Sequence, residues 1–141
     1  MFKTIVLALD GSDGSKAAIP LATELARHDH GKIVIAHVEE DTIGKGGGPL
    51  VANEDEIQAE IRKQAEKLSG EGIETDVKMA NVMVGGPAHA IDKIAGDVGA
   101  DLIVMGRRGT SPLGGLLLGS VTQRLLHISD RPVLAAPPKS S

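Results

Sequence analysis

The 141-residue chain contains no cysteine, no tryptophan, no tyrosine and a single phenylalanine, Phe2. Without cysteine, disulfide bonds, thiolate metal sites and cysteine nucleophiles are all excluded. With one aromatic side chain, the stacking platform of proteins that bind single-stranded nucleic acid is absent. Any planar ring that the protein binds must therefore be held by aliphatic side chains and by backbone groups.

Long apolar runs are also missing. The first run, residues 4–9, is too short and wrongly flanked for a signal peptide, and no run approaches the length of a membrane helix. The formal net charge is −4, with both signs mixed along the chain, so composition does not suggest a groove for a polyanion. We expect one cytoplasmic domain, residues 1–141, that binds neither nucleic acid nor a membrane.

The apolar residues that are present follow two alternating periodicities. Continuous apolar runs predict buried strands at 4–9, 32–38, 101–106 and 132–137. Apolar residues at helical spacing predict helices that include 18–25, 57–68, 87–98 and 121–128. Residues 73–80 instead alternate apolar and polar side chains, which predicts a strand with one solvated face at a sheet edge.

This order of elements predicts the fold class. Strands that alternate with helices form an open α/β fold, with a parallel sheet covered by helices on both faces. We expect the apolar first and fourth strands to be central neighbours. Ligands of such folds bind beyond the carboxyl ends of the strands, where the winding direction reverses. Asp10 and Gly106 would bracket that point.

Residues 106–120, GRRGTSPLGGLLLGS, contain five glycines and follow the predicted fourth strand directly. We predict a loop from 106 to 119 and a helix that begins at Ser120, whose Ser-x-x-Gln pattern with Gln123 fits a capping box. A helix N-terminus after such a loop suits phosphate, with hydroxyl donors at Ser120 and Thr122. An ordinary helix cap after a flexible loop is the alternative. The stretch is not a Walker A loop, because no lysine precedes the serine.

The motif Gly106-x2-Gly109-x9-Gly119-Ser120 resembles the nucleotide motif of the universal stress protein family, in its ATP-binding branch. The segments IVLALDGS, ADLIVMGRRG and LGSVTQRLLHISDRPVL resemble the same family, so the likeness runs from end to end. It implies a single-domain, five-stranded parallel sheet of order 3-2-1-4-5, similar to adenine nucleotide alpha hydrolases. It also implies a homodimer through the last strand, residues 132–137, whose uncharged sequence independently suggests a covered edge. Cover by the C-terminal tail PKSS or by a helix is the alternative to a dimer.

The resemblance assigns residues to parts of an adenine nucleotide. Asp10 matches the acidic residue beside the ribose, or beside the metal and phosphates, and Ala8 and Leu9 would approach the adenosine. Val38 would meet adenine through its backbone. The ribose and phosphate side would be lined by Met105, Gly106, Arg108, Gly109, Gly119, Ser120, Val121 and Thr122.

The function implied is an ATP-binding regulatory module for the stress response, with Mg²⁺ accompanying the nucleotide. Two alternatives stay open: a slow ATPase or phosphotransferase that uses the same pocket, and a binder of another adenine ligand such as a cyclic nucleotide. No nucleophile–base–orienter set can be assembled from the sequence, so we assign no catalytic residue.

Several other residues have plainer interpretations. We interpret His28 and His30 as cations at a helix C-terminus rather than as a metal pair, and His37 and His89 as structural. Of Arg107 and Arg108, at most one is expected to reach a phosphate. The glycine-rich segment 44–49, with Lys45, is interpreted as a connector, with a lid over the nucleotide as the alternative.

Overall fold

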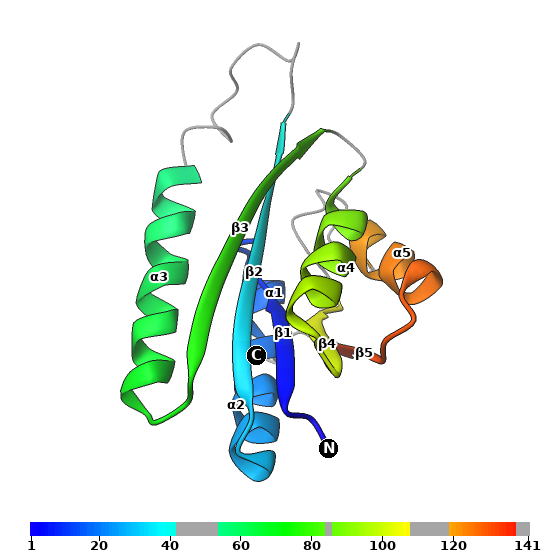
Figure 1. Cartoon of the computed structure of the whole chain (residues 1–141). Coiled ribbons are helices and arrows are strands. Elements are labelled where there is room, and N and C mark those ends of the chain that lie inside the picture. The colour runs from blue at the N-terminus through cyan, green and yellow to red at the C-terminus, as the bar shows by residue number, and fades with distance from the viewer. Residues whose placement is uncertain (42–53, 84–85, 108–118, 138–141) are drawn as a thin grey trace.

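The five strands in the described part of the chain form one parallel sheet in the order β3-β2-β1-β4-β5 (Figure 1). The computed structural model describes residues 1–41, 54–83, 86–107 and 119–137. The strands are β1 (Thr4–Ala8), β2 (Lys32–Asp41), β3 (Thr75–Met83), β4 (Leu102–Gly106) and β5 (Val133–Ala136). The fold class and strand order are those that the sequence and the family resemblance predict.

Helices cover both faces of the sheet (Figure 1). They are α1 (Asp13–Lys16), α2 (Ala18–Asp29), α3 (Glu54–Gly70), α4 (Pro87–Val98) and α5 (Ser120–Ile128). Residues of α2 and α3 pack with Ile5 and Leu7 on one face, and residues of α4 and α5 pack with Val6 and Ala8 on the other. No helix in the four described ranges is long and apolar enough to cross a membrane.

Period-two alternation explains why the central strands are apolar throughout. Successive side chains point to opposite faces, so a strand covered by helices on both faces needs an apolar residue at every position. At β3 the outer row, Glu74, Asp76 and Lys78, is exposed. β3 and β5 are the two edges of the sheet, which confirms the edge positions predicted for both.

Two features of the elements differ from the prediction. β2 continues to Asp41, because it pairs with β3 as far as Asp41 and Met83, whereas its pairing with β1 ends at Ala36. The four-residue helix α1 was not predicted, because it has no room for an apolar repeat. Its N-cap is Ser12, whose side chain accepts a hydrogen bond from the backbone N–H of Ser15.

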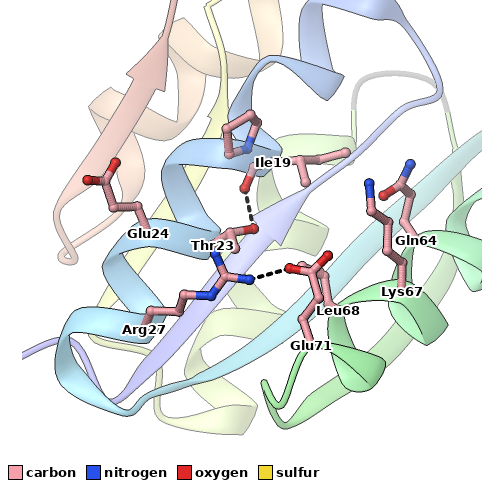
Figure 2. Close-up of a pocket in the computed structure, with 9 residues that line it drawn as sticks. Ile19, Thr23, Glu24, Arg27, Gln64, Lys67, Leu68 and Glu71 are labelled. Atoms are coloured by element: carbon pink, nitrogen blue, oxygen red, sulfur yellow. Dashed lines mark hydrogen bonds and ion pairs between the residues drawn. The ribbon is translucent and has the colours of Figure 1, made fainter.

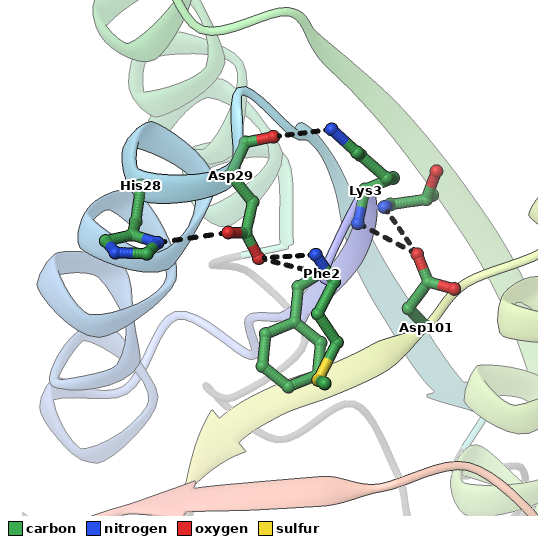
Figure 3. A network of polar contacts seen from close by, with 7 residues as sticks. Phe2, Lys3, His28, Asp29 and Asp101 are labelled. Carbon is green, nitrogen blue, oxygen red and sulfur yellow. Dashed lines mark hydrogen bonds and ion pairs between the residues drawn. The ribbon is translucent and has the colours of Figure 1, made fainter.

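Asp29, the last residue of α2, holds the start of β1 at the amino end of the sheet (Figure 3). Its Oδ2 accepts a 2.7 Å hydrogen bond from the backbone N–H of Phe2 and lies 3.1 Å from the Met1 ammonium. Its Oδ1 lies 3.0 Å from Nδ1 of His28. The Phe2 N–H above all, and then His28 and the terminal ammonium, hold the pKa of the Asp29 carboxyl well below its usual range.

Candidate functional site

The carboxyl ends of β1 and β4 lie side by side in the sheet, with Leu7 opposite Val104. β2 pairs with the other side of β1. Strands β2 and β3 extend the sheet in one direction from β1, and β4 and β5 extend it in the other, so the winding direction reverses between β1 and β4. This is the switch point at which ligands of open α/β sheets bind. The structure therefore brings together the two strand ends that the sequence predicts, with Asp10 after one and Gly106 at the end of the other.

Asp10 is half-buried and fixed by the short loop that leads into α1. Its Oδ1 accepts hydrogen bonds from the backbone N–H of Ser12, at 2.9 Å, and from Ser12 Oγ, at 2.5 Å. Its backbone N–H donates to Ser15 Oγ at 3.2 Å. Among the described residues, none donates a hydrogen bond to Oδ2. The carboxylate is thus held through one oxygen, and the other can accept from a ligand.

Gly106 is buried between α1 and the first turn of α5. A Cβ at this position would lie 2.2 Å from the carbonyl oxygen of Gly14, so only glycine lets β4 approach the backbone of α1. The carbonyl oxygen of Gly106 accepts a 3.0 Å hydrogen bond from Thr122 Oγ1. Packing therefore accounts for glycine here, and its predicted place beside a ribose stays a prediction.

The start of α5 differs from the predicted capping box. Gly119 is the N-cap, with φ −62° and ψ 151°, and no side chain caps the helix. The extended residue is the one before Ser120, and its carbonyl accepts the first helical hydrogen bond, from the N–H of Gln123. Ser120 is consequently the first helical residue, and its side chain is exposed.

The consequence is a set of backbone donors at the start of α5 that no residue of the described ranges uses. The backbone N–H groups of Ser120, Val121 and Thr122 precede the first intrahelical hydrogen bond, and no described residue outside the helix accepts from them. The hydroxyl of Thr122 uses its one donor on Gly106, so it is not available to donate to a phosphate while that bond is kept. The donors at this helix start are therefore the backbone groups and the exposed hydroxyl of Ser120.

Four of the predicted adenosine and phosphate residues meet in one apolar cluster on the α4 and α5 face. Ala8 and Met105 are buried there, and Val38 and Val121 are half-buried against them. Leu9 is buried on the opposite face, under α2 and α3. Arg108, Gly109 and the segment 44–49 lie outside the described residues.

Three residues of this region were not predicted to take part. Ser12 and Ser15 organise Asp10, and their spacing after the first strand, DGSDGS, is a signal that sequence reasoning could have used. His37 is buried in β2, as predicted for a strand residue, but its ring contacts both Leu9 and Glu54. Residues so far apart in the sequence give no pattern that would reveal those contacts.

Other histidines lie where the sequence interpretation places them. His28 is in the last turn of α2, and His30 is its C-cap in the left-handed conformation, with φ 53°. Among the described residues, no group of three or more histidine, aspartate or glutamate side chains could hold a metal ion. Both histidines thus lie at the C-terminal end of α2, as the sequence interpretation places them.

A groove of about 520 Å³ lies between α2 and α3 (Figure 2). Its floor includes Thr23, whose hydroxyl donates to the Ile19 carbonyl at 2.7 Å, and an ion pair between Arg27 and Glu71 spans it. None of the predicted nucleotide-site residues that the structure describes lines it. The groove is therefore separate from the candidate site.

The family model described as "Universal stress protein family" matches residues 1–137. The chain belongs to this family. The universal stress protein YxiE of Bacillus subtilis is 34% identical over 95% of this chain and 98% of that protein. Among solved structures, protein MJ0577 of Methanocaldococcus jannaschii has a TM-score of 0.84 at 26% identity, covering 100% of this chain and 99% of that one.

A second solved universal stress protein was crystallised in complex with cAMP. Its TM-score is 0.65 at 30% identity, and the match covers 98% of both chains. The similarity extends over the full length of these relatives. An adenine ligand thus occurs in at least one family member with the same fold as this universal stress protein.

Proposed function

We propose that this universal stress protein binds an adenine nucleotide, ATP with Mg²⁺, across the carboxyl ends of β1 and β4. The observation that supports this most directly is the start of α5, where three backbone N–H groups have no capping side chain among the described residues. A helix N-terminus of this kind attracts phosphate through its free donors and its partial positive charge. The helix start is tied to Gly106, next to the Asp10 loop.

The other parts of the nucleotide have matching surroundings. The apolar cluster of Ala8, Val38, Met105 and Val121 offers aliphatic contacts for adenine in a protein without an aromatic platform. Asp10 Oδ2 can accept a hydrogen bond from a ribose hydroxyl. Mg²⁺ would be held chiefly by the phosphates and water, as it commonly is with nucleotides, because the described residues hold no cluster of three ligands.

Calorimetry of the purified protein with ATP, ADP, AMP and cAMP, each with Mg²⁺, tests the proposal. Gly119→Val should abolish binding, because the branched side chain would fill the space in front of the free N–H groups. The backbone angles of Gly119 are ordinary extended ones, so valine can adopt them without strain. The matched control is Gly70→Val at the end of α3, where a Cβ meets nothing within 4 Å.

The results separate the alternatives. A dissociation constant of about 1 mM corresponds to a binding free energy of only about −4 kcal/mol. Failure of all four ligands to bind at about millimolar concentration would therefore contradict the proposal. Unchanged affinity in Gly119→Val would contradict the phosphate position. Displacement of ATP by cAMP at lower concentration would favour a cyclic nucleotide as the ligand. Steady phosphate release that is lost in Asp10→Ala would favour an ATPase.

We also propose that a second copy of this chain covers β5. β5 is an edge of the sheet, it carries no charge between Pro132 and Pro137, and Leu134 is 36% exposed. An uncharged edge strand presents unpaired N–H and C=O groups and invites pairing with another strand. Such a dimer would be a regulatory module that contains two nucleotide sites.

A further inference from the structure

His37 lies on β2 with its ring directed to the α3 side of the sheet, and its exposed fraction is 3%. Nδ1 lies 2.8 Å from the carbonyl oxygen of Leu9, and Nε2 lies 2.8 Å from Oε2 of Glu54, the first residue of α3. A carbonyl oxygen can only accept a hydrogen bond, so Nδ1 must carry a proton. The second nitrogen faces a carboxyl group, and this contact needs a proton of its own.

The His37–Glu54 pair therefore holds one proton between the ring and the carboxyl group. When this proton is present, the ring donates from both nitrogens and every contact is satisfied. When it is lost, Nε2 and the carboxylate become two acceptors 2.8 Å apart in a buried place, and this contact must open. Glu54 Oε2 also accepts a 2.8 Å hydrogen bond from Gln58 Nε2, which holds the carboxyl group towards the ring.

Three charged groups on the neighbouring elements contact residues other than His37. Asp10, after β1, bonds to Ser12. Lys16 of α1 forms an ion pair with Glu60 of α3 at 3.9 Å. Arg62 of α3 lies 3.9 Å from Met79 Sδ on β3. Within the described ranges, Glu54 is thus the one charged group that contacts the His37 ring.

The ring is connected to the candidate site through the peptide group between Leu9 and Asp10. The carbonyl oxygen of this peptide accepts from His37 Nδ1, and its N–H donates to Ser15 Oγ. A peptide group is planar, so bonds at both of its ends fix its rotation. That rotation sets the direction in which the Asp10 side chain leaves the backbone. His37 thus acts on the site through Asp10 and is a positioning residue.

We propose that the protonated His37–Glu54 pair braces the Leu9–Asp10 peptide and presents Asp10 to the nucleotide, so that loss of the shared proton weakens binding. The inference rests on the proposed nucleotide site. The brace is complete while the pair holds this proton and is lost when the proton leaves. Nucleotide affinity should therefore fall with rising pH, by about tenfold, the effect of one buried hydrogen bond.

The first test needs no nucleotide. NMR of the histidine ring nitrogens, from about pH 5.5 to about pH 9, reports how many protons the His37 ring carries. We expect both nitrogens to be protonated at the low end, and the Asp10 amide and carboxyl signals to shift together with the His37 titration. A His37 ring with one proton throughout, or Asp10 signals that do not follow His37, would overturn the proposal even if no nucleotide binds.

The second test is calorimetry with Mg²⁺–ATP over the same pH range. Glu54→Gln should flatten the pH dependence, because an amide can either donate to or accept from the ring. His37→Asn keeps a donor near Leu9 and should bind more tightly than His37→Leu, which leaves the Leu9 carbonyl without one. The matched control is His127→Gln, which replaces an exposed histidine at the far end of α5. Its ATP affinity should depend on pH as that of the wild type does.

The outcomes are distinct from those of the proposed function. If the wild type binds ATP with an affinity that does not change while His37 loses its proton, the brace is wrong and the site stands. If Glu54→Gln keeps the full pH dependence, the brace is also wrong. If no nucleotide binds at any pH, the proposed function fails, and the Asp10 signals alone decide whether the brace exists.

Discussion

Thr122 Oγ1 donates a 3.0 Å hydrogen bond to the carbonyl oxygen of Gly106, and this bond joins the first turn of α5 to the end of β4. Both residues are buried, so the carbonyl has no access to water as a substitute partner. The bond fixes where the free N–H groups of the helix lie relative to the sheet. It is therefore a structural requirement of the candidate site rather than a contact to a ligand.

Thr122→Val should lower the free energy of unfolding by about 1–3 kcal/mol, because it leaves the Gly106 carbonyl buried without a donor. Urea denaturation followed by circular dichroism measures the change. Thr122→Ser, which keeps the hydroxyl, is the control and should lose less. Equal stability of the valine variant and the wild type would show that the hydrogen bond contributes nothing.

Gly106→Ala should destabilise the protein by about 2–4 kcal/mol, because the new methyl group would collide with the backbone of α1. The matched control is Gly96→Ala, inside α4, where the nearest atom to a new Cβ is 3.8 Å away. That control should stabilise the protein by about 0.5–1 kcal/mol, since alanine favours a helix over glycine. Thermal unfolding of both variants distinguishes crowding from helix propensity, and similar midpoints for the two would argue against the collision.

Asp29→Asn should lower the melting temperature at neutral pH. The pKa of Asp29 is lowered in the folded state, so its carboxylate stabilises the fold above the unfolded-state value of about 4. This contribution decreases progressively as the pH falls below that value and is lost only at the lowered pKa of the folded state, so the difference between wild type and variant should shrink steadily as the pH is lowered. Asp97→Asn, in an exposed pair with Lys93 on α4, is the control and should change little. A constant difference between Asp29→Asn and the wild type at every pH would refute the charge explanation.

Leu134→Lys should convert the proposed dimer into a monomer, because a charge on the edge strand opposes strand pairing. Sedimentation velocity measures this change in oligomeric state directly. Leu126→Lys is the control: Leu126 is a leucine exposed by 50%, but it lies on α5 rather than on the edge strand. A wild type that sediments as a monomer at every concentration would exclude the dimer.

Much of the fold could be predicted because it depends on local periodicity. Apolar runs identified the strands, helical spacing identified α2 to α5, and the alternation in residues 73–80 identified an edge strand. The family resemblance supplied the strand order, and α/β winding rules placed Asp10 and Gly106 at the switch point. The capping-box prediction was wrong. Ser120 and Gln123 have the spacing of that motif, but Ser120 is the first helical residue and Gly119 is the N-cap.

The amino-acid sequence by itself determined the class of fold, the family and the segments that form the candidate site. Only the tertiary structure decided what individual residues do there. It showed that glycine at position 106 allows β4 to lie close to the backbone of α1. It also showed that the Thr122 hydroxyl donates to a backbone carbonyl, and that the His37 ring contacts Leu9 and Glu54. The physical reason is range: propensity and periodicity act between near neighbours in the chain, whereas these contacts arise only when separate elements pack together.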